Sequence, residues 1–196
     1  SCRPFSRDRS GMVLAEGAAF VVLESAAHAQ ARGAAPIARL AGYGLATDVD
    51  HITRPSVAGQ AAAMRAALVD AALAPEAIGY INAHGTGTPA NDGVETAAIR
   101  AVFGAHADAL AVSSTKSMHG HALGAAGALE FAIALMALRA QLAPPTAHLR
   151  APDPACDLDY LADGARSLPH LAAVMSNSFA FGGTNAVLVA CRDDLG

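Results

Sequence analysis

The chain has 196 residues, of which 53% are hydrophobic and 15% are charged, and its formal net charge is −4. This balance predicts a folded chain with a sizeable core and argues against disorder. Because the charge is negative and no stripe of basic residues is visible, we expect no nucleic-acid partner.

The three cysteines, Cys2, Cys156 and Cys191, are scattered and show no paired spacing. This pattern predicts free thiols and a cytoplasmic location. Residues 1–10 are polar and charged, unlike a signal peptide. The longest apolar run, residues 122–138, contains Glu130, which is costly in lipid, so we expect no membrane partner. The chain does not begin with Met, and we expect a processed piece or one half of a longer protein.

Apolar runs of strand length alternate with alanine-rich helical segments. Residues 11–24 end in a continuous apolar run, which predicts a buried strand. Ser25 is expected to cap a short helix that ends at Gly33. The other predicted strands are 36–47, 78–83, 110–113, 171–177 and 184–191. The other predicted helices are 58–73, from Asn91 or Asp92 to about 103, and about 120–140. Irregular structure is expected for residues 48–57, the segment around Lys116 and residues 144–169.

Four strand–helix alternations followed by a hairpin at Gly182–Gly183 predict a layered α/β fold with buried strands. No internal repeat is apparent, and no linker divides residues 1–196, so we expect one domain.

Three loops of chemical interest each follow or join predicted strands: residues 84–92, 114–121 and 176–185. In layered α/β proteins, sites gather at the carboxyl ends of the strands. We therefore expect these loops to meet, although they are far apart in the sequence.

His84 stands at a strand end beside two glycines and a proline, in the sequence HGTGTP. Glycines let the backbone approach a ligand closely. His84 is a candidate hydrogen-bond donor or base, and a turn histidine that bonds its own loop is an equal alternative.

His121 stands among Gly120, Gly124 and Gly127 at the predicted start of the long helix. Because glycines destabilise helices, close packing of substrate or of backbone is the expected compensation. Lys116, a nearby cation, would disfavour protonation of His121 and leave it as a neutral donor. Packing alone for the glycines, and a solvated loop position for Lys116, remain as alternatives.

Glu130 lies nine residues after His121, so a regular helix from His121 would place the two on opposite faces. An unpaired buried carboxylate is improbable, and Lys116 is the first candidate partner. The turn in residues 177–186, between Phe179 and Phe181, is either a donor of backbone N–H groups and a pocket gate or a plain hairpin turn.

Metal and dinucleotide sites are not expected. His119 and His121 have no acidic or cysteine ligand close in sequence. Gly120, Gly124 and Gly127 do not follow the GxGxxG spacing.

Three segments in this order, INAHGTGTPANDGVE, SSTKSMHGHALGAAGALE and SNSFAFGGTNAVLV, resemble the β-ketoacyl-acyl-carrier-protein synthases of the elongating type and related polyketide ketosynthases. The resemblance covers essentially the whole chain. It implies a thiolase-like fold, with residues 1–196 as the α-β-α carboxyl-terminal half of an α-β-α-β-α architecture.

The resemblance also implies roles for single residues. His84, His121 and Lys116 match the catalytic histidines and lysine, and Glu130 matches the acidic partner of the lysine. Phe181 matches the gating phenylalanine. Supporting or substrate-binding positions fall on Gly182, Thr86, Thr88, Phe179 and Phe181. The family's nucleophilic cysteine would precede residue 1, and no cysteine of this chain matches it.

The activity implied is decarboxylative Claisen condensation of an acyl thioester with malonyl-carrier protein, an acyl transfer in fatty acid or polyketide synthesis without a cofactor. The implied partners are an acyl carrier protein and a second ketosynthase chain, as homodimer or heterodimer. A non-catalytic partner like the chain-length factors is the alternative. Alone, residues 1–196 are expected to be inactive and to expose apolar surface.

Overall fold

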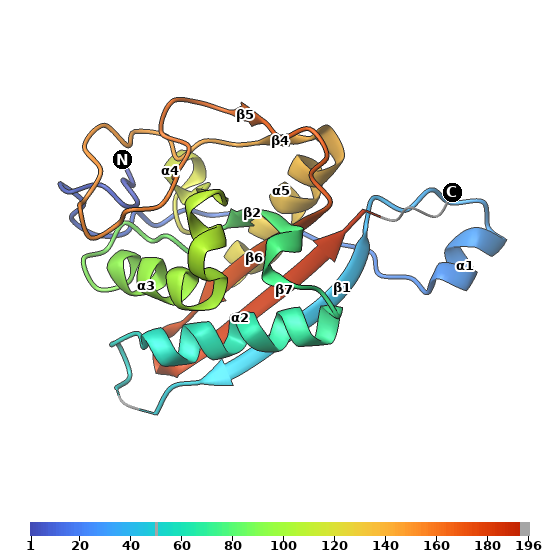
Figure 1. The fold of residues 1–196 in the computed structure, drawn as a ribbon, viewed down its shortest axis with the longest axis horizontal. Coiled ribbons are helices and arrows are strands. Elements are labelled where there is room, and N and C mark those ends of the chain that lie inside the picture. The colour runs from blue at the N-terminus through green and yellow to red at the C-terminus, as the bar shows by residue number, and fades with distance from the viewer. Residues whose placement is uncertain (50, 193–196) are drawn as a thin grey trace.

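The computed structural model describes residues 1–49 and 51–192, which form three layers around a five-stranded sheet (Figure 1). The strand order is β1-β7-β6-β2-β3. Strands β6, β2 and β3 run parallel to one another, whereas β7 is antiparallel to both β6 and β1. The strands are β1 Arg39–Thr47, β2 Ile78–Asn82, β3 Ala111–Ser113, β6 Ala173–Phe179 and β7 Thr184–Cys191, and a separate pair comprises β4 Leu142–Ala143 and β5 Arg166–Ser167.

Helices cover both faces of this sheet. The helices are α1 Ala26–Ala31, α2 Val57–Ala71, α3 Asp92–Phe103, α4 Lys116–His119 and α5 Ala126–Ala140, with 3-10 turns at Pro75–Ala77, Gly104–Asp108, Leu123–Ala125 and Phe181–Gly183. Helices α2 and α3 pack on one face, and α5 packs on the other. The predicted layered α/β fold is therefore confirmed.

Alternate residues of each central strand enter two separate cores. In β2, Ile81 faces the core under α2 and α3, whereas Tyr80 faces the core under α5. In β6, Met175 and Val174 divide in the same way. Because both faces are buried, these strands appear in the sequence as continuous apolar runs.

Helix α2 lies directly on the edge strand β1. A Cβ atom added at Gly44 would lie 2.0 Å from the Ala63 carbonyl oxygen, and one at Gly42 would lie 2.4 Å from the Ala71 nitrogen. Glycine at these positions brings the helix backbone into contact with the strand.

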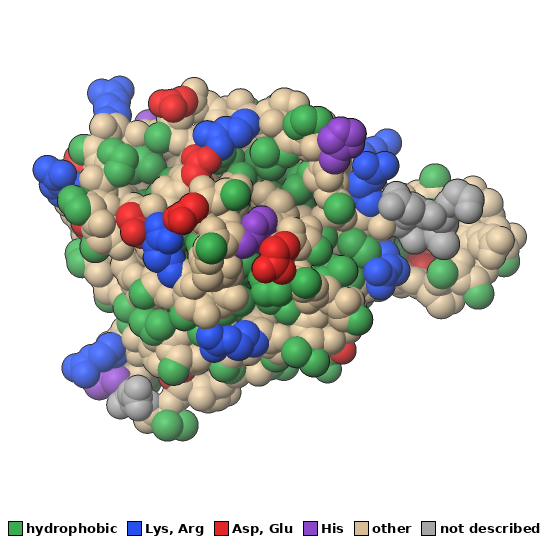
Figure 2. Space-filling model, viewed as in Figure 1, with side chains coloured by type: hydrophobic (Ala, Val, Ile, Leu, Met, Phe, Trp, Pro, Cys, Tyr) green, Lys and Arg blue, Asp and Glu red, His purple; other side chains and the backbone are tan. Residues whose placement is uncertain are grey.

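Charged side chains of both signs are spread over the face that α2 and α3 cover (Figure 2).

The predicted buried strand at residues 11–24 is wrong. This segment makes one isolated bridge, from Leu14 to His121, and Phe20 and Val22 are 93% and 85% exposed. A strand needs a neighbour along its length to pair with its backbone N–H and C=O groups. The first residues of this segment bond Gly87 and His121, but no ladder to a described strand continues through residues 17–24. The apolar composition of residues 11–24 indicated strand propensity, but it carries no information about whether a neighbouring strand is present.

The long helix also begins later than expected. A 3-10 turn spans Leu123–Ala125 and α5 starts at Ala126, so His121 precedes the helix, and Lys116 opens the short helix α4 rather than a loop. Gly120 has φ 75°, and a Cβ there would lie 2.9 Å from the Val13 carbonyl oxygen. The chain therefore turns at Gly120, and His121 and Glu130 do not share one regular helix.

By length and composition, residues 123–140 would suffice to cross a membrane. An apolar helix in a protein core passes the same test, and here Phe131, Ala134 and Leu138 pack in the core beneath the sheet. The helix is therefore weak evidence for a membrane segment.

Candidate active site

The ends of β2, β3 and β6 bring the predicted loops together. Because these parallel strands end at the same edge, the loops that follow them meet there. The ring centroids of His84 and His121 are 5.5 Å apart, edge to face, and those of His84 and Phe179 are 5.8 Å apart. The expectation that the three loops meet is confirmed.

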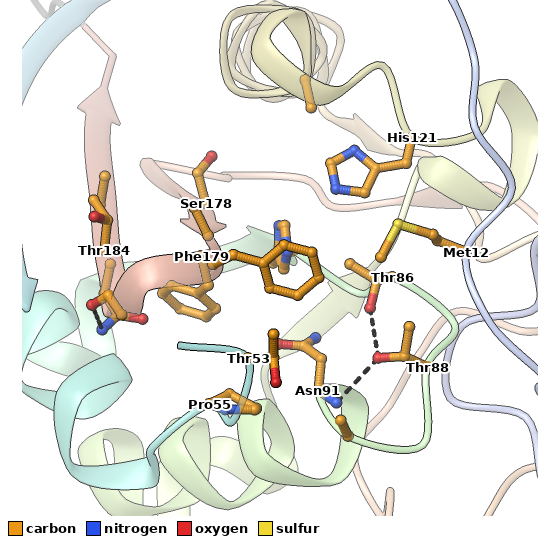
Figure 3. A pocket seen from close by; sticks show the side chains of 18 of the residues that line it. Met12, Thr53, Pro55, Thr86, Thr88, Asn91, His121, Ser178, Phe179 and Thr184 are labelled. Atoms are coloured by element: carbon orange, nitrogen blue, oxygen red, sulfur yellow. Dashed lines mark hydrogen bonds between the residues drawn. The ribbon is translucent and has the colours of Figure 1, made fainter. Parts of the chain in front are cut away.

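A cavity of about 640 Å³ opens at this edge (Figure 3). Six of the predicted residues line it, namely His84, His121, Thr86, Thr88, Phe179 and Phe181. Thr86 and Thr88 share a hydrogen bond of 2.9 Å, and the Thr88 hydroxyl accepts the Asn91 N–H at 3.1 Å (Figure 3). Both threonine side chains are therefore held in place on the cavity wall.

Lys116 lies behind His84 and outside the cavity lining, with a side chain that is 0% exposed. Its ammonium donates to the His84 carbonyl oxygen at 2.6 Å and lies 3.5 Å from His84 Nδ1. It also lies 2.5 Å from Glu130 Oε1, which confirms the predicted partner of Glu130. Lys116 thus contacts His84 without lining the cavity.

These contacts assign the neutral tautomer of each cavity histidine. An ammonium is only a donor, so His84 Nδ1 must accept, and the proton resides on Nε2. His121 Nδ1 accepts the Leu123 N–H at 3.1 Å, which again leaves the proton on Nε2. Both rings therefore offer an Nε2–H donor.

Burial keeps both rings neutral. It is the main reason that the pKa of His84 lies well below its usual value, with Lys116 and His121 contributing in the same direction. Burial, followed by the Lys116 charge, lowers the pKa of His121 to about 4. At neutral pH both side chains are therefore uncharged donors.

Glu130 is nearly enclosed, and burial raises its pKa to about 7 against the opposing attraction of Lys116. Neither carboxylate oxygen has a hydrogen-bond partner of good geometry among the described residues. The close contact with Lys116 is therefore an ion pair by distance. The Lys116 charge is the main interaction that offsets the cost of burying the Glu130 carboxylate.

Phe181 begins the turn between β6 and β7, and its side chain is 69% exposed at the cavity. Gly182 and Gly183 have φ of 81° and 76°, as the tight turn requires. The Gly182 N–H donates to the Ile52 carbonyl oxygen at 2.7 Å, so Gly182 is not a free donor for an oxyanion in this conformation.

A buried carboxylate that the sequence analysis missed fixes the His84 loop. Glu95 accepts the N–H groups of His84 and Gly85, each at 2.8 Å, and side-chain amides of Asn91 and Asn177, each at 3.2 Å. The segment NDGVE contains acids in the first turn of α3, a pattern typical of exposed residues at a helix N-terminus. The available signal therefore pointed to a surface role.

The three thiols are free and buried, and none lines the cavity. The Cys2 thiol donates to the Thr86 carbonyl oxygen at 3.3 Å, behind the loop, and burial raises its pKa. Among the described residues, no group of three or more His, Cys, Asp or Glu could hold a metal ion.

Residues 37–150 match the family described as "Beta-ketoacyl synthase, C-terminal domain". Nodulation protein E of Rhizobium leguminosarum bv. trifolii is 56% identical over 96% of this chain, and 3-oxoacyl-[acyl-carrier-protein] synthase 2 of Coxiella burnetii is 52% identical over 97%. In both cases the match covers 46% of the relative. The chain thus spans about half the length of these curated relatives.

A solved structure is similar over nearly the whole chain. It is described as AntDE:AntF, a type II PKS acyl-carrier protein in complex with its ketosynthase bound to the hexaketide. The TM-score is 0.95 at 38% identity, and the match covers 98% of this chain and 48% of that one. The fold predicted from the motifs, the carboxyl-terminal half of the thiolase-like ketosynthase architecture, is confirmed.

Proposed function

Since the chain belongs to the β-ketoacyl synthase family, as its carboxyl-terminal domain, we propose that it supplies the two histidine donors of a decarboxylative Claisen condensation. The observation that carries this proposal is the pair of neutral imidazoles, His84 and His121, that line one cavity with their Nε2–H groups available. The general role as a ketosynthase agrees with its relatives' names.

The reaction places negative charge where these donors lie. In the proposed sequence, a thiolate outside this chain first takes the acyl group from a carrier-protein thioester and releases the carrier thiol. A malonyl thioester then breaks its bond to the terminal carboxylate, releases CO₂ and leaves an enolate. Hydrogen bonds from His84 and His121 stabilise the enolate oxygen as its charge develops.

The enolate carbon then attacks the acyl thioester, forms the new C–C bond and expels the enzyme thiolate, so the chain grows by two carbons. Neutral donors suit this step because they need not transfer a proton to hold the oxygen. Lys116 serves as a positioning residue, since it contacts His84 but not the cavity. Phe181 gates the entrance, and its exposure at the cavity supports that assignment.

The test uses the full-length enzyme and measures CO₂ release from malonyl-carrier protein. His84→Ala and His121→Ala should each lower the decarboxylation rate by about 10²- to 10⁴-fold. His121→Gln, which places an amide N–H near the position of Nε2, should retain part of the activity. His28→Ala, at an exposed position on α1, is the matched control. Undiminished decarboxylation in both alanine variants would sink the assignment.

The isolated chain is proposed to be inactive, with the nucleophile and the remaining layers in an amino-terminal half. Support comes from apolar side chains that no described segment covers, including Phe20 and Val22 and, on β1, Tyr43 and Leu45. A homodimer or a heterodimer of ketosynthase chains is proposed on the same ground. Chain elongation by purified residues 1–196 alone would contradict the proposal.

The proposal also places the enzyme in the cytoplasm, where the three buried free thiols would remain reduced. An acyl carrier protein is its proposed partner, as in the similar solved complex.

A further inference from the structure

One cationic side chain lines the cavity. Among the described lining residues, Arg54 is the sole Lys or Arg and Asp48 is the sole acid. Asp48 already has a role in the fold, since its Oδ2 accepts the N–H of Ser56, which caps the N-terminus of α2. A carboxylate is favourable there because the helix dipole presents positive charge.

Arg54 has no such role in the fold. Its side chain is exposed, and no described residue makes a hydrogen bond or an ion pair with it. A guanidinium offers five donors in a planar fork that matches phosphate and carboxylate oxygens. An unpartnered arginine on a cavity wall is therefore a candidate to recognise an anion that enters with the substrate.

The backbone around Arg54 is held in place. The Thr53 N–H donates to His51 Nδ1 at 3.1 Å, and the Ile52 carbonyl oxygen accepts the Gly182 N–H at 2.7 Å. Pro55 follows directly and restricts Arg54 to extended backbone conformations. The backbone of Arg54 is thus held at the cavity wall by the fold, whereas its exposed side chain is free to move.

The neighbours of Arg54 lie across the cavity from His121. Thr53 and Pro55 are on the wall opposite His121, with Phe179 between them (Figure 3). An anion bound by Arg54 would therefore lie on the wall opposite one of the two proposed enolate donors. This placement favours an anion in a part of the substrate other than the malonyl group that reacts.

We propose that Arg54 binds the phosphodiester of the substrate's carrier arm and so favours thioesters that carry this phosphate over those that lack it. This inference rests on the proposed condensing function. The malonyl carboxylate is the other possible source of an anion. A cation beside that carboxylate would stabilise the charged ground state that decarboxylation must lose, which is unproductive for catalysis.

The experiment compares two soluble substrates with the full-length enzyme: malonyl-phosphopantetheine and malonyl-pantetheine, which differ only in the phosphate. Acetyl thioesters of the same two arms report acyl transfer to the enzyme. Wild-type enzyme should prefer the phosphorylated arm by about fivefold in kcat/KM, mainly through KM, as expected for a partly exposed ion pair.

Arg54→Ala should abolish this preference, Arg54→Glu should reverse it, and Arg54→Lys should retain most of it. Arg65→Ala is the control, because Arg65 is an exposed arginine on α2 that does not line the cavity. Equal losses on phosphorylated and unphosphorylated arms would overturn the inference. Losses confined to malonyl substrates, on both arms, would identify the carboxylate instead and would also overturn it.

The outcome is separable from that of the proposed function. If the wild-type enzyme neither decarboxylates malonyl thioesters nor accepts acetyl groups from any arm, the proposed function fails. If it does both and Arg54→Ala keeps the wild-type phosphate preference, only the role of Arg54 fails.

Discussion

Lys116 Nζ lies 2.5 Å from Glu130 Oε1, and the two side chains are 0% and 1% exposed. Lys116 is the only lysine of the chain, and it also donates to the backbone carbonyl oxygen of His84. A buried ion pair therefore stands directly behind one of the two cavity histidines. The Lys116 charge helps to lower the pKa of both His84 and His121, although Lys116 does not line the cavity.

The first prediction concerns the pH dependence of decarboxylation. The pKa of His84 lies well below 6.5 and that of His121 is about 4, so the neutral rings should persist in mildly acidic solution. Activity should therefore fall only below the usual pKa of histidine. Replacing the pair by Lys116→Met with Glu130→Gln removes the cation, raises both histidine pKa values and should shift the acidic limb towards higher pH.

The measurement is kcat/KM against pH for the full-length enzyme, with histidine NMR titration as a direct readout of the pKa values. The double variant avoids leaving an unpaired charge. Arg65→Met, which removes a cation distant from the cavity lining, is the control and should leave the acidic limb in place. An unchanged acidic limb in the double variant would show that burial alone sets these pKa values.

The second prediction concerns stability. Glu130→Ala should lower the free energy of unfolding by about 3–5 kcal/mol, because it leaves the buried Lys116 charge without compensation. The double variant Lys116→Met/Glu130→Gln should recover a large part of this loss. Urea unfolding of the full-length protein measures both effects.

A matched control is the pair formed by Glu24 and Arg32, which has the same 2.5 Å separation and is partly exposed. Glu24→Ala should have little effect, since solvent screens such pairs. Equal losses in the two alanine variants would contradict the importance of burial.

The third prediction concerns Glu95 as a positioning residue. Its carboxylate accepts the N–H groups of His84 and Gly85, so Glu95→Ala should displace the histidine and lower kcat by about 10- to 100-fold. KM should change less, since Glu95 does not line the cavity. Glu95→Gln keeps the shape and one acceptor oxygen and should retain more activity.

Steady-state kinetics of the folded variants, with near-UV circular dichroism to confirm packing, provide the readout. Glu76→Ala, at an exposed position, is the control. A rise in KM with unchanged kcat in Glu95→Ala would argue against the positioning role.

The fourth prediction tests the contact between β1 and α2. Gly44→Ala places a methyl group 2.0 Å from the Ala63 carbonyl oxygen, so it should destabilise the fold by about 1–3 kcal/mol or more. Gly93→Ala, on α3, meets nothing within 4 Å and should leave stability unchanged or raise it by up to about 1 kcal/mol. Thermal unfolding of both variants measures the difference. A Gly44→Ala variant as stable as wild type would mean that α2 can move away from the strand without loss.

The hairpin and the alternation of strands and helices were predictable because local patterns determine them. Apolar runs of strand length, the Ser25 cap and the Gly182–Gly183 turn each act within a few residues. The pairing of Lys116 with Glu130 was also predictable, since a carboxylate in an apolar helix requires a nearby cation. Boundaries were less certain, and α5 begins six residues later than expected because the chain turns at Gly120.

Long-range partners were not predictable. The apolar segment ending at Val22 has the composition of a buried strand, but whether it is buried depends on a neighbouring strand. Glu95 resembles a surface residue at a helix start until the fold places the His84 loop and Asn177 against it. Local sequence carries no information about these contacts.

The sequence by itself determined the types of the main strands and helices from residue 36 onward and the residues that stand at the strand ends, because these follow from hydrophobic periodicity and turn chemistry. The tertiary structure alone decided that His84 and His121 face one cavity with Nε2–H donors and that Lys116 lies behind them. It also decided that Arg54 reaches the same cavity without a described partner. The physical reason is that burial, tautomer and pKa depend on atoms brought together by parallel strands far apart in the sequence.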